Sequence, residues 1–159
     1  MITYKSSGVD VSKIKKSQSA IGRIIASTHS GTVKSGFGHY AGLVGIHGGR
    51  YLATHTDGVG TKVLIANLLK KYDTIGIDCV AMNVNDIICI GAKPISFVDY
   101  IAANRNNESI FVEIAKGLAV GARKSGMPIV GGETAIMPEI GRAHVLTPVT
   151  SLSRMPSSA

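Results

Sequence analysis

Two long helical patterns on either side of an apolar strand place the strongest constraint on the fold. Residues 74–90 and 107–124 repeat apolar side chains at helical spacing, and we expect Asn107 to cap the second helix. Each pattern ends at a glycine, Gly91 or Gly126, the residue type that most readily follows the last turn of a helix. Residues 95–103, between the two patterns, have the composition of a strand. This alternation predicts a sheet with helices packed on it.

The remaining segments fit the same fold class, which we predict to be α+β, an α/β sandwich built on a mixed sheet. We expect an extended arm (residues 1–16), a short helix capped by Ser17 or Ser19 (20–27) and a glycine-rich loop (30–39). These are followed by a hairpin around His47-Gly48-Gly49 (41–56), a further helix (61–71), and a short buried strand (127–132) that opens into a loop at Glu133.

Composition excludes several classes of protein. The chain has 159 residues, enough for one domain or part of a larger protein, and a net charge of +7. Basic and aromatic residues are not interleaved as in single-strand binders, which argues against a nucleic-acid partner. No apolar run reaches the length of a membrane span, and we expect no membrane partner. Cys79 and Cys89 lack metal-ligand spacing, which suggests a reduced, cytoplasmic protein.

Acidic and amide side chains beside glycine turns, or together on one helix, are the candidates for binding a cation. Carboxylate and amide oxygens are the ligands that Mg²⁺ prefers. Each acid also has a structural interpretation, because Asp before Gly is common in tight turns and Asp often caps backbone groups. The candidates are Asp57, Asp78, Asn85, Asp86 and Glu133.

The glycine-rich stretch "DGVGTK" (57–62) could bind phosphate. Gly58 and Gly60 would allow backbone N–H groups to approach an anion, Thr61 would open a helix, and Lys62 would add a positive charge. The spacing differs from the Walker pattern, so it is a weak signal alone. The five histidines lack metal-ligand spacing. Among them His55, two residues before Asp57, is more typical of a structural or rim residue than of a catalytic one.

The C-terminal segment, residues 141–159, differs from the rest of the chain. "GRAHVLTPVTSLSRMPSSA" has two arginines, no acid, and small polar residues at its end. It could be a strand with a frayed end, or foreign sequence from a fusion or a shifted reading frame. We therefore predict a domain over residues 1–140 and an atypical tail over 141–159.

A set of motifs in a fixed order resembles one enzyme family. It comprises "YKSSGVD" (4–10), "SGFGH" (35–39), "TDGVGTK" (56–62), "DTIGIDCVAMNVND" (73–86), "NDIICIGAKP" (85–94) and "GGETAIMP" (131–138). Together they are similar to the first domain of aminoimidazole ribonucleotide synthetases, which are also called phosphoribosylformylglycinamidine cyclo-ligases. After Pro138 the resemblance ends, and the second domain of that family is missing.

The resemblance implies a reaction and an assembly. The family uses ATP and Mg²⁺ to phosphorylate the formyl oxygen of formylglycinamidine ribonucleotide. A ring-forming nitrogen then displaces phosphate and gives aminoimidazole ribonucleotide, a step of purine biosynthesis. Two copies of the first domain pair their sheets into a β-barrel in a homodimer, and ATP binds near that interface. Since the second domain normally completes the active site, whether this chain is active alone is an open question.

The resemblance also implies roles for individual residues. Catalytic roles fall to Asp57, Lys62 and Asp86, and metal binding to Asp57, Asn85, Asp86 and Glu133, with Asp78 as an additional candidate. The implied nucleotide-binding residues are Lys5, Gly36, Gly38, Thr56, Gly58, Gly60, Thr61, Lys62, Gly132, Glu133 and Thr134. The alternatives are another ATP-binding enzyme of the superfamily, similar to selenophosphate synthetase or thiamine-phosphate kinase, or a non-catalytic dimerising fragment.

Overall fold

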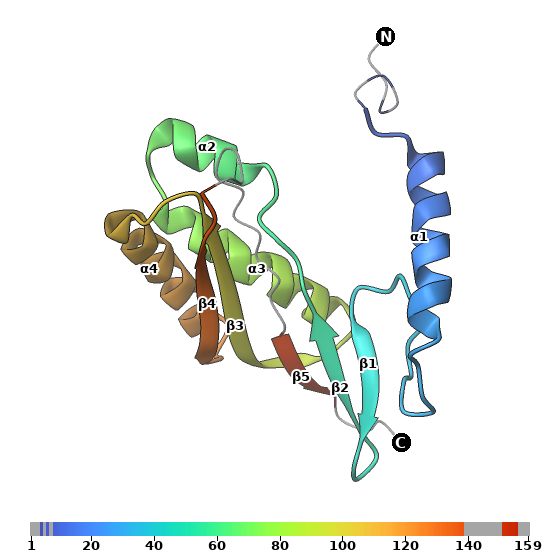
Figure 1. Ribbon diagram of the computed structural model, residues 1–159. Coiled ribbons are helices and arrows are strands. Elements are labelled where there is room, and N and C mark those ends of the chain that lie inside the picture. The colour runs from blue at the N-terminus through green and yellow to red at the C-terminus, as the bar shows by residue number, and fades with distance from the viewer. Residues whose placement is uncertain (1–3, 5, 7, 139–150, 156–159) are drawn as a thin grey trace.

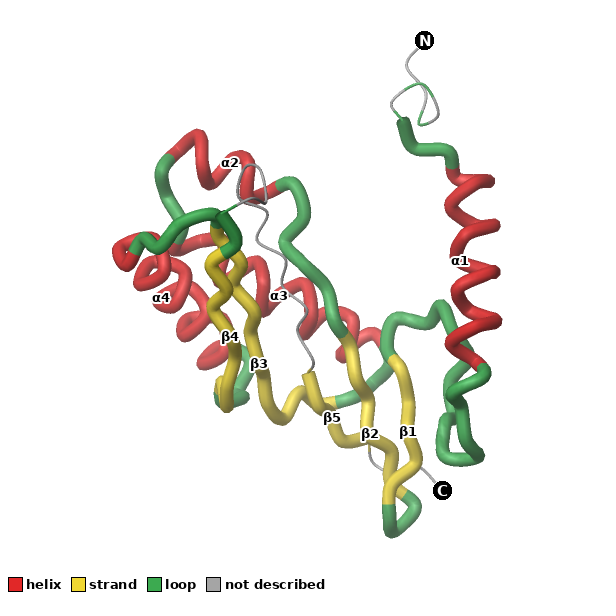
Figure 2. Tube along the Cα trace, in the orientation of Figure 1, coloured by secondary structure: helices red, strands yellow, loops and turns green. Residues whose placement is uncertain are grey.

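The computed structural model describes residues 4, 6, 8–138 and 151–155 (Figures 1 and 2). No helix within these residues is long and apolar enough to cross a membrane. The elements are α1 (Val11–Ala26), β1 (Gly42–Ile46), β2 (Arg50–His55), α2 (Lys62–Leu69), α3 (Asp73–Cys89), β3 (Lys93–Ala103), α4 (Glu108–Lys124), β4 (Ile129–Ile136) and β5 (Ser151–Met155).

The strands form one mixed sheet in the order β1-β2-β5-β3-β4. Neighbouring strands are antiparallel except β3 and β4, which are parallel and joined through α4. The two long helices, α3 and α4, lie together behind β3 and β4 (Figure 1). The predicted mixed sheet packed by helices is therefore confirmed.

The hairpin and the two long helices lie where the sequence predicted them. Gly48 and Gly49 have φ angles of 78° and 69° in the β1–β2 turn, a conformation that side chains with a Cβ rarely adopt. Asn107 caps α4 by accepting a hydrogen bond from the Ile110 N–H. Gly91 and Gly126 have φ angles of 73° and 65° just after α3 and α4, which ends both helices as predicted.

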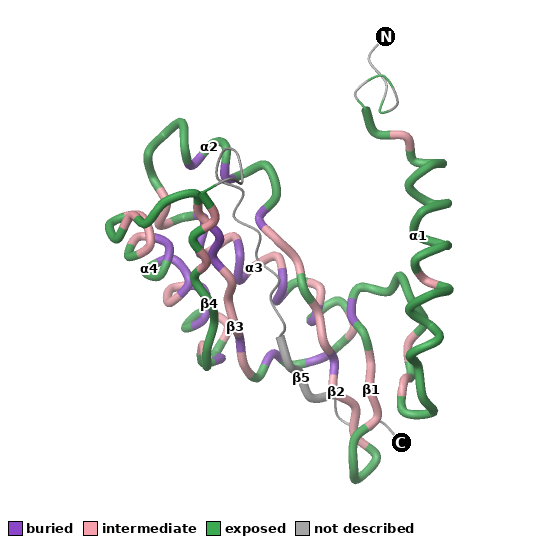
Figure 3. The backbone as a smooth tube through the Cα atoms, in the orientation of Figure 1, coloured by how far each residue is buried: buried purple, intermediate pink, exposed green. Residues whose placement is uncertain are grey.

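The main core lies between β3, α3 and α4. Phe97 of β3 and Val80 of α3 are almost completely buried, and Ile114 and Leu118 of α4 join them. Figure 3 shows this buried layer and the exposed outer faces of the helices. A second small cluster joins Ile87 of α3 to Ala53 of β2, Ala41 and Ala92, so α3 packs on both halves of the sheet.

The predicted start of the first helix is wrong. The extended arm over residues 1–16 is not observed beyond Asp10, and neither Ser17 nor Ser19 is the cap. The Asp10 carboxylate accepts hydrogen bonds from the Ser12 and Lys13 N–H groups and starts α1 there. Helix α1, described at every residue, has no buried side chain and stands apart from the sheet (Figures 1 and 3).

The strand after α4 is longer and more exposed than predicted. Strand β4 continues through Glu133 to Ile136, where a loop was expected, because it pairs in parallel with β3 along this whole stretch. Residues 130–134 of β4 are exposed rather than buried. Within the described residues β4 has β3 as its one neighbour, which leaves it at the edge of the sheet.

One strand lies within the tail that we predicted to be atypical. Strand β5 pairs with β2 on one side and β3 on the other. The tail's remaining residues, 141–150 and 156–159, lie outside the described part of the chain. The origin of residues 141–159 and the domain boundary at residue 140 stay predictions.

Helices α3 and α4 cross at two glycines, and this crossing generates a stability prediction. A Cβ built on Gly117 would overlap the backbone carbonyl of Asp73, and one on Gly76 would overlap the backbone of Ile114. Both obstacles are backbone atoms that cannot rotate away. We expect Gly117→Ala to lower the free energy of unfolding by about 2 kcal/mol or more, because the helices must separate.

Urea denaturation followed by circular dichroism measures this change. Gly31→Ala is the matched control, because Gly31 is exposed and no described atom beyond its chain neighbours lies within 4 Å of the place its methyl group would take. Equal stability of the two variants would contradict the close crossing.

Candidate functional site

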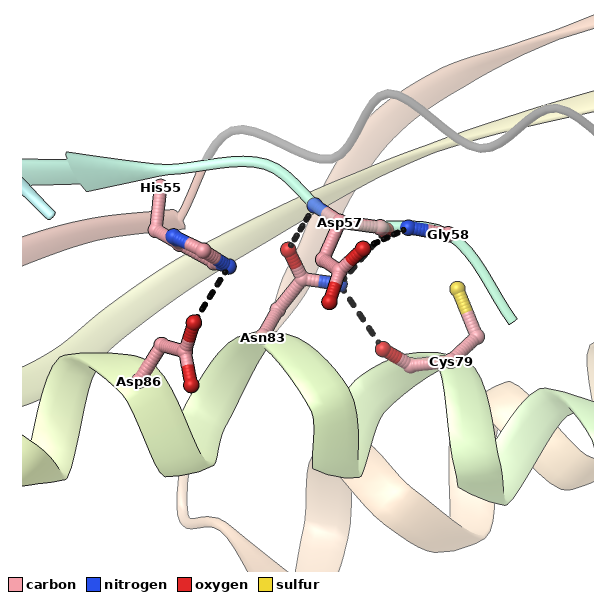
Figure 4. Close-up of polar contacts among 6 residues, drawn as sticks. All are labelled: His55, Asp57, Gly58, Cys79, Asn83 and Asp86. Carbon is pink, nitrogen blue, oxygen red and sulfur yellow. Dashed lines mark hydrogen bonds and ion pairs between the residues drawn. The ribbon is translucent and has the colours of Figure 1, made fainter. Parts of the chain in front are cut away.

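The end of β2 is tied to the middle of α3 by one buried side chain. Asn83, with 0% of its surface exposed, accepts a hydrogen bond from the Asp57 N–H at 2.9 Å. Its amide nitrogen donates to the carbonyl oxygens of Asp57 at 3.1 Å and Cys79 at 2.9 Å (Figure 4). Both halves of the amide are thus used to hold the Asp57 backbone against α3.

The segment after β2 is irregular around Asp57, and a turn follows only at Gly60 and Thr61, before α2. The Asp57 carboxylate accepts a hydrogen bond from the Gly58 N–H at 2.8 Å. Val59 is buried, and Gly60 has a φ angle of 59°, which favours glycine. The bond from the Gly58 N–H to the Asp57 carboxylate is compatible with cation binding, because a carboxylate offers several acceptor positions.

Three side chains converge beside this turn. One ligand atom from each of His55, Asp57 and Asp86 can be chosen so that all three lie within 4.8 Å of one another. Within this group, His55 Nε2 and Asp86 Oδ2 are 3.2 Å apart (Figure 4). Two carboxylates and an imidazole at this spacing are a donor set that fits a divalent cation.

A cleft of about 930 Å³ opens next to the three side chains. His55, Thr56 and Asp86 line one wall, and the loop that contains Gly38 lines another. The lining residues are Phe37, Gly38, His39, Tyr40, Ala41, Gly42, Thr54, His55, Thr56 and Asp86. Gly38, Thr56 and Asp86, predicted separately, therefore share one cleft, and Gly36 lies in the same loop as Gly38.

Lys62 has a partner of its own. As the first residue of α2 it forms an ion pair with Asp78 of α3, with 3.0 Å between Nζ and Oδ1. Both side chains are partly exposed, so solvent weakens the attraction. Thr61, just before the helix, makes no side-chain capping bond to any described residue. Lys62 is thus held near the start of α2, and Asp78 serves as its counter-ion.

The predicted residues of β4 lie elsewhere. Between β4 and β2 stand β5 and β3, which puts three strand spacings, about 14 Å, between them. Gly132 packs against Asp99, whose carboxylate and carbonyl occupy the space a Cβ would need. Thr134 lines a different hollow, shared with Asp99, and burial raises the pKa of the Asp99 carboxyl above its ordinary value. Glu133 is exposed on the same strand.

Two further predicted site residues, Asn85 and Lys5, are not found beside His55, Asp57 and Asp86 in the described structure. Asn85 is exposed on α3, two residues beyond Asn83 and so on a different face of the helix. Lys5 lies outside the described residues.

One known protein family matches most of the chain. The profile of the family described as "AIR synthase related protein, N-terminal domain" matches residues 38–152. The chain belongs to this family. The match includes the cleft residues from Gly38 onward, the three converging side chains and β4.

Similar proteins extend well beyond this chain. A protein of Saccharolobus solfataricus named phosphoribosylformylglycinamidine cyclo-ligase is 46% identical over 144 residues, which are 91% of this chain and 44% of that protein. The chain therefore spans less than half the length of this relative.

Solved structures share the fold. One is tt0281 from Thermus thermophilus, with a TM-score of 0.69, 22% identity, and coverage of 86% of this chain and 43% of that one. Another is T. maritima PurL complexed with ATP, with a TM-score of 0.59, 16% identity, and coverage of 83% and 23%.

Sequence reasoning missed two residues of this AIR synthase related domain. Asn83 was not singled out, although it lies three residues before Asp86 and so on the same side of α3. His55 was considered and set aside. A signal was present, because residues two apart along an extended segment point to the same side and His55 is two residues before Asp57.

The hydrogen bonds of Asn83 generate a second prediction. Asn83→Ala leaves the Asp57 N–H and C=O without their buried partner, and we expect it to lower the free energy of unfolding by about 1–3 kcal/mol. Asn85→Ala, the same change at an exposed position of the same helix, should stay within about 0.5 kcal/mol of the original.

Urea denaturation of both variants measures this difference. A loss of stability for Asn85→Ala as large as that for Asn83→Ala would contradict the anchoring role of Asn83.

Isothermal titration of the same Asn85 variant with Mg²⁺ also tests Asn85 as a metal ligand, because unchanged affinity would remove Asn85 from the predicted metal ligands.

Proposed function

We propose that this chain is the ATP-binding half of a cyclo-ligase that converts formylglycinamidine ribonucleotide to aminoimidazole ribonucleotide, ADP and phosphate in purine biosynthesis. The observation that carries the proposal is the group of three side chains, His55, Asp57 and Asp86, of which His55 and Asp86 line a cleft. Membership of the AIR synthase related family and the similarity to a protein named as the cyclo-ligase support it.

The donor set supports a divalent cation bound by Asp57 and Asp86. Each contributes a carboxylate to the group, one from the segment after β2 and one from α3, and Asn83 holds the Asp57 backbone in place. Mg²⁺ is the expected ion, since it joins one or two carboxylates to the phosphates of a nucleotide. When bound, the cation would neutralise charge on the transferred phosphoryl group.

The chain's own residues would position the nucleotide. The cleft beside Asp86 is large enough for a nucleotide, and Phe37 and Tyr40 offer aromatic faces along it. The backbone N–H groups near Gly58, Gly60 and Thr61 would face the phosphates, with Lys62 supplying positive charge beside them. The loop that contains Gly36 and Gly38 would cover the nucleotide and exclude water.

Phosphoryl transfer depends mainly on such positioning and charge neutralisation. The formyl oxygen of the substrate would take the γ-phosphoryl group and release ADP. The ring-forming nitrogen would then attack the formyl carbon and lose a proton. The bond between that carbon and the phosphorylated oxygen would break, which releases phosphate.

A homodimer would give the β4 residues a role. Gly132, Glu133 and Thr134 lie on an exposed edge strand away from His55 and Asp57. In the expected dimer, where the sheets of two copies form a β-barrel, these residues would reach the cleft of the partner copy. Glu133 would then complete the oxygen ligands of the cation there. We propose that the assembly works in the cytoplasm, where the nucleotide substrates occur.

Removing one carboxylate charge tests the cation site. We expect Asp57→Asn to weaken Mg-ATP binding about tenfold or more, because a neutral amide is a poorer ligand for Mg²⁺. Isothermal titration calorimetry measures the affinity. Glu108→Gln, an equal loss of charge at an exposed position at the start of α4, should bind Mg-ATP as the original chain does. Equal affinities of the two variants would contradict the metal role of Asp57.

Turnover tests the reaction itself. We expect this chain, joined to the remaining C-terminal part of the Saccharolobus solfataricus relative, to release ADP from Mg-ATP only when formylglycinamidine ribonucleotide is present. The unjoined chain should bind Mg-ATP but release little ADP. A joined protein that binds Mg-ATP yet never responds to this substrate would contradict the cyclo-ligase activity. Rapid turnover by the unjoined chain would instead contradict the need for the second half.

A further inference from the structure

His55 lies where a cation ligand would lie, although its spacing from the other histidines does not mark it as one. It is the last residue of β2, and its side chain is only 13% exposed. Its Nε2 atom is 3.2 Å from Asp86 Oδ2. Two ligand atoms at right angles around a cation, each about 2.1–2.2 Å from it, stand about 3.0 Å apart. The observed separation therefore matches two adjacent ligands of one cation.

The burial and hydrogen bonding of His55 Nε2 give a second, independent observation. Nε2 is buried and makes no hydrogen bond to any described residue. Its contact with Asp86 has the distance of an ion pair without the geometry of a hydrogen bond. A buried polar nitrogen without a hydrogen bond is costly, and a cation between it and the carboxylates would satisfy it.

We propose that His55 is a third protein ligand of the cation site, through Nε2, and that this nitrogen makes the site hold Mn²⁺ more tightly than Mg²⁺. Mg²⁺ prefers oxygen ligands, whereas first-row transition metals accept imidazole nitrogen readily. The inference rests on the cation site of the proposed function and adds to it the choice of metal. Asp57 and Asp86 supply the charge, and His55 supplies the selectivity.

A different role for His55 makes a different prediction. If its imidazole merely pairs with the Asp86 carboxylate, the bound cation has oxygen ligands alone. Replacing His55 would then change the affinities for Mn²⁺ and Mg²⁺ by similar factors. The nitrogen–metal bond therefore distinguishes the two roles directly.

The experiment detects that bond by pulsed electron paramagnetic resonance of Mn²⁺ bound to the full chain, with no nucleotide added. We expect a ¹⁴N modulation typical of imidazole, which changes to the ¹⁵N pattern when the chain is made with ¹⁵N-histidine. This measurement needs no variant, so it does not depend on whether a substitution folds. In His55→Ala the signal should disappear, and in His47→Ala, altered in the exposed hairpin turn, it should remain.

Titrations of both variants complete the test. We expect His55→Ala to weaken Mn²⁺ binding about tenfold or more and Mg²⁺ binding by less than about threefold. Mn²⁺ bound without a histidine nitrogen signal would overturn the inference, and so would a failure of the original chain to bind Mn²⁺.

The test of His55 as a metal ligand can succeed or fail independently of the test of cyclo-ligase activity. A histidine nitrogen signal in a chain that does not bind ATP would support the inference while contradicting the cyclo-ligase function. Normal Mg-ATP binding and turnover by the joined protein, with no such signal, would overturn the inference alone.

Discussion

Two hydrogen bonds of the Asn83 side chain join the two halves of the candidate site. They fix the backbone of Asp57, two residues after β2, to α3 one turn before Asp86, and a third bond, to the Cys79 carbonyl, holds the Asn83 amide within α3. Because Asn83 is fully buried, these bonds are shielded from water, and losing them would leave polar groups unsatisfied. This contact helps to hold Asp57 in position relative to Asp86.

The position of α3 itself depends on close packing elsewhere. Gly76 and Gly117 let α3 and α4 approach until backbone meets backbone, and Val80 and Phe97 fill the core beside that crossing. A rigid α3 with its other end packed on Ala53 of β2 can hold side chains at a fixed spacing. Stability and site geometry therefore share one helix, and a change at Gly117 would be expected to disturb both.

The two carboxylates beside the cleft suit a cation. Two neighbouring carboxylates repel one another less when a cation lies between them, and Lys62 is already paired with Asp78. A divalent ion at the cleft wall would offset the charge of the carboxylates, satisfy the buried nitrogen of His55, and present positive charge to phosphates. Taken singly, His55, Asp57 and Asp86 each have an ordinary structural interpretation. Taken together, they form a donor set for a cation.

Much of the fold could be predicted because its signals are local. The hairpin at Gly48-Gly49, the Asn107 cap and the glycine ends of α3 and α4 each depend on a few neighbouring residues. The start of α1 was missed because several residues could have capped it, and local sequence does not rank Asp10 against the serines that follow. The extent of β4 was missed because pairing with β3, rather than its glycine-rich composition, decides where that strand ends.

By itself the sequence determined the alternation of helices and strands, the glycine-rich segment between β2 and α2, and the acidic residues available to bind a cation. Only the tertiary structure decided which of them meet. It joined His55 and Asp57 to Asp86, brought Asn83 to the backbone of Asp57, and placed Glu133 three strands away. The reason is that contacts between residues some 30 positions apart depend on how α3 packs on the sheet, which no local pattern encodes.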